Sequence, residues 1–315
     1  MTPSLRLTVV EGVRLPTRVH CHVHDDSRRW GRFVPRDDDI FISTPPKSGT
    51  TWMQGIVSSL LWPDGDAPAP AFDVSPWVDA RIVPVDEMMA RLEAIPHRRF
   101  LKTHSPADTT PIFTWCRYLT VYRDGRDALV SWANHRAKMR PEIIEACNAD
   151  AAGDGIAPWP PRWSGDLDVL FDEWVDWGTP MEHLASWWPL RHEPFVLLVH
   201  YADLLADLEG EMRRIAGFLG IDVPSDRWPG AVDRCRFESM RDQHGSGSLL
   251  QSAFEGGESA FFNRGTSGRW REVLTAKQLA RHDALVAEHL PPEAASWLEH
   301  GSLALGRRPD ASDQG

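Results

Sequence analysis

The chain has 315 residues, a formal net charge of −11 at pH 7 and 42% apolar residues. The acidic balance argues against a general nucleic-acid binder, because phosphate backbones are held largely by basic surface. No run of 18 apolar residues indicates a membrane span. The four scattered cysteines form no C-x-x-C pair and no signal peptide is evident, which favours a reducing cytoplasm. We expect one α/β domain over residues 1–315.

The amino-terminal segment, residues 1–35, is expected to lie at an edge of the structure. His20, His22 and His24 alternate along it, so on a strand their side chains would share one face, as metal ligands can. No second group of residues at typical ligand spacing supports a metal, and an edge strand is the simpler interpretation. The acidic run at residues 37–39 is interpreted as a solvated turn.

Residues 39–52 read as an apolar strand, a turn carrying Lys47, and the start of a helix. The helix places Met53, Ile56, Val57, Leu60 and Leu61 on one stripe. The first turn of a helix leaves backbone N–H groups without partners and carries a partial positive charge, so an anion beside Ser48 to Thr51 would meet several donors. The lysine precedes the glycine, unlike the order of a Walker A loop. Taken alone, the segment predicts either a phosphate-binding turn or an ordinary glycine-containing turn.

Further apolar runs alternate with helical patterns, which predicts a central, mostly parallel sheet flanked by helices. The runs are Ile40 to Ile42, Phe100 to Leu101, Tyr118 to Tyr122 and Phe195 to Val199. Pro and Gly residues, which break helices and strands, are spread along the chain, and no long linker or repeat is evident. This pattern favours a single domain.

Lys102 and His104 lie two residues apart at the end of the second run, so both side chains emerge on the same face. Only four of the 34 basic residues are lysines, and Lys47 and Lys102 are two of them. That bias suggests that a compact ammonium group is needed at both positions. A lone histidine is usually structural, so a structural role is the alternative for His104.

Arg123 directly follows the third run, at the end where parallel sheets bind ligands, and Ser131 lies eight residues further on in a helical pattern. A second phosphate could bind there, held by a guanidinium and a short hydroxyl donor. The alternative is that Arg123 pairs with Asp124 or Asp127 on the surface.

The stretch of residues 137–181 mixes Pro and Gly with tryptophan and is expected to be a partly mobile lid. The chain has 15 tryptophans. Several are expected in loops, namely Trp77, Trp159, Trp163, Trp174 and Trp177. They could form a wall for a bulky apolar ligand or simply pack the lid, and both interpretations stay open. Residues 301–315 are expected to be a flexible tail.

In both content and order, four motifs resemble the cytosolic sulfotransferase family, with features of actinobacterial members. They are PKSGTTW, KTH at Lys102 to His104, YRDGRDALVS at Tyr122 to Ser131 and FFNRGTSGRW at Phe261 to Trp270. The resemblance implies a fold related in plan to P-loop nucleotide kinases. It also implies transfer of the sulfuryl group of 3′-phosphoadenosine 5′-phosphosulfate to an acceptor hydroxyl or amine. No metal is implied.

The resemblance also implies the residues that bind the donor. They are Lys47, Ser48, Gly49, Thr50, Thr51, Trp52, Arg123, Ser131, Tyr201, Phe237, Phe262, Asn263, Arg264 and Gly265. Trp52 and Phe237 match the aromatic pair around adenine, and Tyr201 matches a tyrosine that contacts the nucleotide. Asn263 stands where the family usually has arginine, which should weaken the hold on the 3′-phosphate unless Arg269 or Arg236 compensates. Cys235 replaces a threonine that usually bonds the base.

His104 is the expected general base. An acceptor alcohol needs a base as its oxygen attacks sulfur, and neutral imidazole suits that task near pH 7, with a pKa of about 6.5 if unperturbed. Lys47 and Lys102 would stabilise the charge that develops on the sulfuryl and bridging oxygens.

The acceptor is expected to be an apolar small molecule or a glycolipid, contacted by Trp77, Trp159 and Trp163. If the acceptor is a lipid, peripheral contact with a membrane is expected, and no oligomeric state is predicted. Two other classes of function remain open, a P-loop kinase that needs Mg²⁺ and a catalytically silent nucleotide-binding protein. The order of the loop residues disfavours the kinase, and His104 beside Lys102 disfavours the silent protein.

Overall fold

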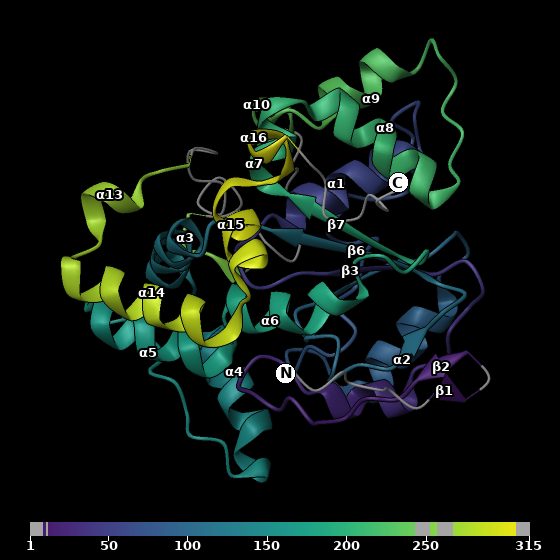
Figure 1. The fold of residues 1–315 in the computed structure, drawn as a ribbon. Helices are drawn as coiled ribbons and strands as arrows, with labels where there is room; N and C mark the ends of the chain where they lie inside the picture. Colours follow the sequence, from purple (N-terminus) through teal and green to yellow (C-terminus); the bar gives the residue numbers. More distant parts are fainter. Residues whose placement is uncertain (1–8, 11, 243–252, 257–266, 307–315) are drawn as a thin grey trace.

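The computed structural model describes residues 9–10, 12–242, 253–256 and 267–306 (Figure 1). Within these residues, a central sheet is built from four parallel strands in the order β4-β3-β6-β7. The strands are β3 (Ile40–Ser43), β4 (Phe100–Thr103), β6 (Arg117–Tyr122) and β7 (Val196–His200). The four apolar runs therefore form the predicted parallel sheet.

The register of the sheet brings the ends of its strands to one edge. Ser43 at the end of β3 pairs with Thr103 at the end of β4 and with Thr120 in β6. Tyr122 at the end of β6 pairs with His200 at the end of β7. Because all four strands are parallel, the segments that follow them start from the same edge, where parallel sheets bind ligands.

Helices cover both faces of the sheet because alternate strand residues point to opposite sides. On one face, Ile40, Ile42 and Val121 share a buried cluster with residues of α1 (Thr50–Leu61), α8 (Leu208–Leu219) and α9 (Trp228–Arg234). On the other face, Phe41, Tyr118 and Tyr122 share a cluster with residues of α3 (Gly125–Lys138) and α6 (Pro180–Trp187). Figure 1 shows α1, α8 and α9 on one side of the sheet and α6 on the other.

The remaining helices extend these two layers. They are α2 (Val85–Ala94), α4 (Pro141–Ala151), α5 (Leu167–Trp177), α7 (Tyr201–Ala206), α10 (Phe237–Asp242), α13 (Trp270–Val273), α14 (Ala276–His289), α15 (Pro292–His300) and α16 (Ser302–Leu305). Short 3₁₀ helices occur at η1 (Ser27–Arg32), η2 (Ala152–Asp154) and η3 (Trp188–Leu190). None of the described helices is long and apolar enough to cross a bilayer.

Helix α1 confirms the predicted apolar stripe. Met53, Ile56, Val57 and Leu60 are buried against the sheet, and only Leu61 at the end is partly exposed. Gly49 caps the helix with a φ of 116°, a conformation that strongly favours glycine. A side chain there would also approach Val121 and Tyr201, at 3.3 and 3.2 Å from a Cβ. The turn before α1 is therefore fixed in place by the core.

The amino-terminal segment differs from the expected edge strand. Strands β1 (Val9–Val10), β2 (Val13–Arg14) and β5 (Ile112–Phe113) form a separate antiparallel sheet. Residues 20–24 form no strand, because this segment makes only one isolated bridge, between Cys21 and Asp26. Its polar side chains bond inward to other segments instead of joining a ladder.

Two other expectations about local structure were wrong. Trp174 and Trp177 are not in loops but on α5, so the stretch of residues 137–181 contains the helices α4 and α5. The start of the expected tail forms α16, whose Ser302 and Leu303 N–H groups donate to the buried Asp203 carboxylate at 2.9 and 3.0 Å. Residues 307–315 lie outside the described residues.

The acidic run before β3 is a solvated turn only in part, because Asp37 and Asp38 are exposed turn residues whereas Asp39 is not. Asp39 is fully buried, and its carboxylate accepts hydrogen bonds from Arg99 Nε at 2.7 Å and from the Arg36 N–H at 2.8 Å. Arg99 is only 3% exposed and immediately precedes β4. This ion pair therefore joins the beginnings of the two neighbouring strands that carry the site residues at their other ends.

We predict that Asp39→Ala lowers the free energy of unfolding by about 3–5 kcal/mol, because it leaves the Arg99 guanidinium buried without its carboxylate. The double variant Asp39→Leu/Arg99→Leu should lose less, since it buries no charge. Chemical denaturation measures both. Asp86→Ala, which breaks the exposed pair of Arg32 with Asp86, is the control and should change stability far less. Equal losses for the buried and the exposed variants would contradict this account.

Candidate active site

A cavity of about 480 Å³ opens at the edge where the parallel strands end. Many of the residues singled out in the sequence line it. They are Lys47, Gly49, Thr50, Thr51, Trp52, Trp77, Lys102, His104, Arg123, Ser131, Tyr201 and Phe237. These residues come from six separate stretches of the chain. The fold thus gathers them around one space.

The turn between β3 and α1 presents Lys47 to this cavity. Lys47 has a φ of 64°, a left-handed conformation that no other non-glycine residue adopts in the part of the chain that the structure describes. Such a backbone costs on the order of 1 kcal/mol and marks positions where side-chain direction matters. Ser48 does not line the cavity, and its fully buried Oγ finds no hydrogen-bond partner among the described residues.

Three cations lie close together in the cavity. Burial, together with the charges of Lys102 and Arg123, lowers the pKa of Lys47 to about 7. Burial also lowers the pKa of Lys102 to about 8, although Asp79 and Asp25 favour its charged form. The Lys102 ammonium lies over the Trp77 ring, 4.1 Å from its centroid. A bound anion would therefore relieve repulsion and keep both lysines charged.

The imidazole of His104 is oriented by its surroundings. Its Nδ1 lies 2.6 Å from the carbonyl oxygen of Thr44, so Nδ1 must carry the proton and donate, which leaves the lone pair on Nε2. The rings of Trp77 and Trp177 pack edge-on against it, at centroid distances of 4.8 and 5.5 Å. Burial, with the charge of Lys102, lowers the pKa of His104 well below 6.5. The histidine is therefore neutral over a wider pH range than the unperturbed value predicts.

A buried carboxylate that the sequence analysis missed supports this strand end. Asp79 accepts hydrogen bonds from Thr103 Oγ1 and Ser105 Oγ, both at 2.7 Å, and from Trp30 Nε1 at 3.0 Å. Thr103 and Ser105 flank His104 in sequence. Burial raises the pKa of Asp79, and the nearby Asp25 raises it further. The strand end that carries the histidine is thereby anchored on both sides of it.

Arg123 lies on the cavity side of the structure. Its guanidinium is 4.5 Å from the centroid of the Tyr201 ring, and the Trp52 ring meets the same tyrosine edge-on at 5.1 Å. Of the two carboxylates that offered an alternative partner, Asp124 pairs with Arg126, and Asp127 accepts a hydrogen bond from the Gly268 N–H.

The aromatic residues near α1 and α10 form a second part of the cavity. Trp52 and Phe237 both line it. Trp52 Nε1 donates to the carbonyl oxygen of Cys235 at 2.8 Å, so this cysteine positions the tryptophan through its backbone. The Cys235 thiol is buried and lies 3.7 Å from the Gly55 carbonyl, turned into the protein.

The motif near the carboxyl end is only partly described. Phe262, Asn263, Arg264 and Gly265 lie outside the described residues. Arg269, one of the two arginines considered as a replacement for a missing cation, lines the cavity. Arg236, the other one, does not line it and lies 3.7 Å from Asp233. Of these two arginines, Arg269 is the one positioned to compensate.

The remaining wall of the cavity is apolar and differs from the expected one. Trp77 lines it, but Trp159 and Trp163 do not. Trp159 is buried behind the wall, where its ring meets Trp132 and Trp177 at 5.9 and 6.1 Å. The lining is instead formed by Trp77, Ile82, Val83, Trp132, Met139, Ile143, Cys147, Trp177 and Phe254. Trp132 directly follows Ser131 on the same helix, and this position was a signal that it would lie near the cavity.

The histidines near the amino terminus do not form a metal site among the described residues. The ring centroids of His20 and His22 are 6.3 Å apart, as are those of His22 and His24, and His20 and His22 bond to Asp25 and Asp176.

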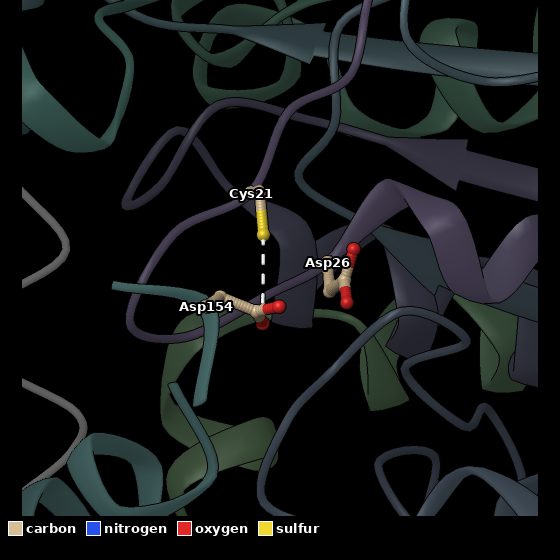
Figure 2. A group of neighbouring side chains, drawn as sticks. All are labelled: Cys21, Asp26 and Asp154. Carbon is tan, nitrogen blue, oxygen red and sulfur yellow. Dashed lines mark hydrogen bonds between the residues drawn. The ribbon is translucent and has the colours of Figure 1, made fainter. Parts of the chain in front are cut away.

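A different group, Cys21, Asp26 and Asp154, brings its ligand atoms within 4.8 Å of one another (Figure 2). Guanidinium groups already occupy its surroundings. Arg28 lies 2.7 Å from Asp26 and 2.6 Å from Asp154, and Arg81 lies 2.7 Å from Asp154. This group is therefore an ion-pair cluster in which arginines neutralise the carboxylates.

Comparison with known proteins agrees with this geometry. A family model described as sulfotransferase domain matches residues 37–291. A glycolipid sulfotransferase of Mycobacterium tuberculosis is 34% identical over 303 residues, covering 88% of this chain and 92% of that protein. Sulfotransferase 1C2 of Oryctolagus cuniculus is 28% identical, covering 89% and 91%.

Solved structures show the same fold. The crystal structure of mouse sulfotransferase SULT7A1 complexed with PAP has a TM-score of 0.62 at 20% identity, covering 86% of this chain and 91% of that chain. The predicted α/β fold and the resemblance of the motifs are thus confirmed. The chain belongs to the sulfotransferase family.

Proposed function

We propose that this protein transfers the sulfuryl group of 3′-phosphoadenosine 5′-phosphosulfate to a hydroxyl group of an acceptor with a large apolar part. The observation that carries the proposal is the meeting of Lys47, Lys102, Arg123 and a neutral His104 in one cavity. Cations alone would suit many anions. A neutral base beside them suits transfer from an anionic donor to a hydroxyl.

The donor would lie across the edge of the sheet. Lys47 and the backbone N–H groups at the start of α1 would hold the 5′-phosphate, as helix amino termini hold anions. Arg123 and Ser131 would hold the 3′-phosphate, with Arg269 nearby. Trp52 and Phe237 would enclose the adenine. One observation supports an anionic ligand here: the charges of Lys102 and Arg123 disfavour the charge on Lys47, and a bound anion would relieve this repulsion.

His104 and the lysines divide the chemistry between them. His104 Nε2 would take the proton of the acceptor hydroxyl, while Nδ1 stays bonded to Thr44. As the acceptor oxygen forms its bond to sulfur, the bond from sulfur to the bridging oxygen breaks and 3′-phosphoadenosine 5′-phosphate leaves with the electron pair. Lys47 and Lys102 would stabilise the negative charge on the leaving and sulfuryl oxygens. We assign no step to a metal ion.

The apolar wall defines the acceptor class that we propose. Residues 137–181 contribute Met139, Ile143, Cys147 and Trp177 to the cavity, so this segment would cover the acceptor. A large apolar part of the acceptor would lie against these side chains. The similarity to a mycobacterial glycolipid sulfotransferase supports a glycolipid or a comparable amphipathic alcohol.

The mouth of the cavity supports a lipid as acceptor. Ile82 and Leu205 line the cavity and are also 45% and 46% exposed. Apolar side chains at a cavity mouth could contact the surface of a membrane, so peripheral contact is part of the proposal. We place the protein in the cytoplasm, where its four free cysteines would stay reduced.

We predict that His104→Ala lowers turnover at least ~100-fold while binding 3′-phosphoadenosine 5′-phosphate normally, because it removes the base and not a nucleotide contact. Labelled donor and a panel of phenols, sterols and glycolipids measure transfer. In the wild type, turnover should persist at pH values well below 6.5, because the histidine stays neutral there. His97→Ala, at the other end of β4, is the control. Activity of His104→Ala within threefold of wild type would refute the assignment.

We predict that Ile143→Ala and Met139→Ala raise the acceptor KM without changing nucleotide affinity. Each removes apolar contact area worth about 1–2 kcal/mol, or roughly 5- to 30-fold in binding. Steady-state kinetics with alcohols of increasing chain length measures the effect, which should grow with length. Trp163→Ala is the control, because Trp163 does not line the cavity. Small sugars proving to be the best acceptors would rule out the apolar wall as the acceptor site.

A further inference from the structure

A histidine of α3 contacts the lysine of the phosphate-binding turn. Lys47 Nζ lies 3.1 Å from His135 Nδ1, within hydrogen-bond distance. His135 lines the same cavity and lies one helical turn after Ser131, so both residues face the proposed nucleotide site. Neither the motifs nor the sequence pattern had singled it out.

The ring of His135 is held by aromatic neighbours. It stacks on Trp132 at a centroid distance of 5.2 Å and an angle of 26°, and Phe254 meets it edge-on at 4.7 Å. Such packing restricts the ring orientation. The position of Nδ1 is therefore set by the core of the protein and not by a mobile side chain.

The charges around His135 exclude its protonated form. Burial lowers the pKa of His135 well below 6.5, and Lys47, His24, Lys102 and Arg136 all lower it further. A neutral imidazole offers one nitrogen as an acceptor. The charged ammonium group of Lys47 has no lone pair and can only donate. In that state, Nδ1 of His135 accepts the hydrogen bond and Nε2 carries the ring proton.

The surroundings of Lys47 make this acceptor important. Lys102 on β4 and Arg123 after β6 face Lys47 and disfavour its charge, as does burial. Its pKa of about 7 means that the ammonium form is easily lost near neutral pH. A lone pair 3.1 Å away stabilises that form.

We propose that His135 is a positioning residue, which holds the Lys47 side chain as a charged donor directed at the 5′-phosphate of the nucleotide. The inference rests on the proposed function, because it assumes that Lys47 meets this phosphate. It extends that function by making donor affinity depend on a residue that need not touch the donor. Without His135, the ammonium form of Lys47 would be lost at a lower pH.

The test is titration with 3′-phosphoadenosine 5′-phosphate by calorimetry at pH 6 and pH 8. His135→Phe keeps an aromatic ring at this position and removes the hydrogen-bond acceptor. We expect it to lower the pKa of Lys47 by about one unit, so the protonated fraction of Lys47 at high pH falls about tenfold. We expect affinity to fall about tenfold at pH 8 and no more than about twofold at pH 6. His135→Gln, whose amide oxygen can accept, should recover most of the loss at pH 8.

Two further variants test whether the effect passes through Lys47. In a Lys47→Met background, His135→Phe should have no further effect at either pH. Asn134→Ala, which removes a neighbouring side chain bonded to the Val130 carbonyl, is the matched control and should behave as wild type. Thermal unfolding checks that each variant folds, and His135→Leu replaces His135→Phe if the latter does not fold.

Three results would overturn the inference: equal affinity of His135→Phe and wild type at both pH values, equal losses at both pH values, or a loss that persists in the Lys47→Met background. Failure of the proposed function gives a different result, since the wild-type protein itself would then not bind 3′-phosphoadenosine 5′-phosphate, and the inference would fall with it.

Discussion

The site depends on three cations that are held together by the ends of parallel strands. Lys47, Lys102 and Arg123 each follow or end a different strand, and the common register of these strands gives them little freedom to separate. Burial and the repulsion from Lys102 and Arg123 lower the pKa of Lys47 to about 7, and burial lowers the pKa of Lys102 to about 8. Such a group of buried cations favours the binding of an anion, because the charge of a bound phosphate stabilises the charged forms of the lysines. The fold therefore assembles the three cations of the proposed donor site without a ligand.

Burial and the charge of Lys102 also set the protonation state of the histidine that we propose as the base. His104 lies beside Lys102, and burial with that charge keeps the imidazole neutral. Its hydrogen bond to Thr44 directs the lone pair of Nε2 away from the backbone, and Asp79 anchors the residues on either side. The imidazole that we propose as the base is thus neutral and oriented, although no carboxylate among the described residues is hydrogen-bonded to it. Three hydrogen bonds to Asp79 Oδ2 offset only part of the cost of burying this carboxylate, whose pKa remains raised.

Much of this was predictable from the sequence, because strand ends and glycine turns have strong local signals. The four strands and α1 follow from such signals, and the resemblance of the motifs to a known family added the roles expected of Lys47, Lys102, His104 and Arg123. The residues of the proposed acceptor wall were not predictable in this way, because they depend on which helix faces the cavity. Trp159 was expected in this wall but lies behind it, whereas Trp132 lines the cavity. Contacts between residues far apart in the sequence could not be predicted either. The pairing of Asp39 with Arg99 and the contact of Lys47 with His135 join residues that are 60 and 88 positions apart.

The most direct test of the account is a comparison of nucleotides that differ in phosphate position, since the cations are arranged around two separate phosphates. Equilibrium binding of 3′-phosphoadenosine 5′-phosphate, adenosine 5′-phosphate and ATP to the wild-type protein would be measured in one buffer at fixed salt. The account predicts that the first binds at least ~30-fold more tightly than the other two, because Arg123 and Ser131 add charge-assisted hydrogen bonds of about 2 kcal/mol to the 3′-phosphate. Binding of ATP with equal or higher affinity would contradict it.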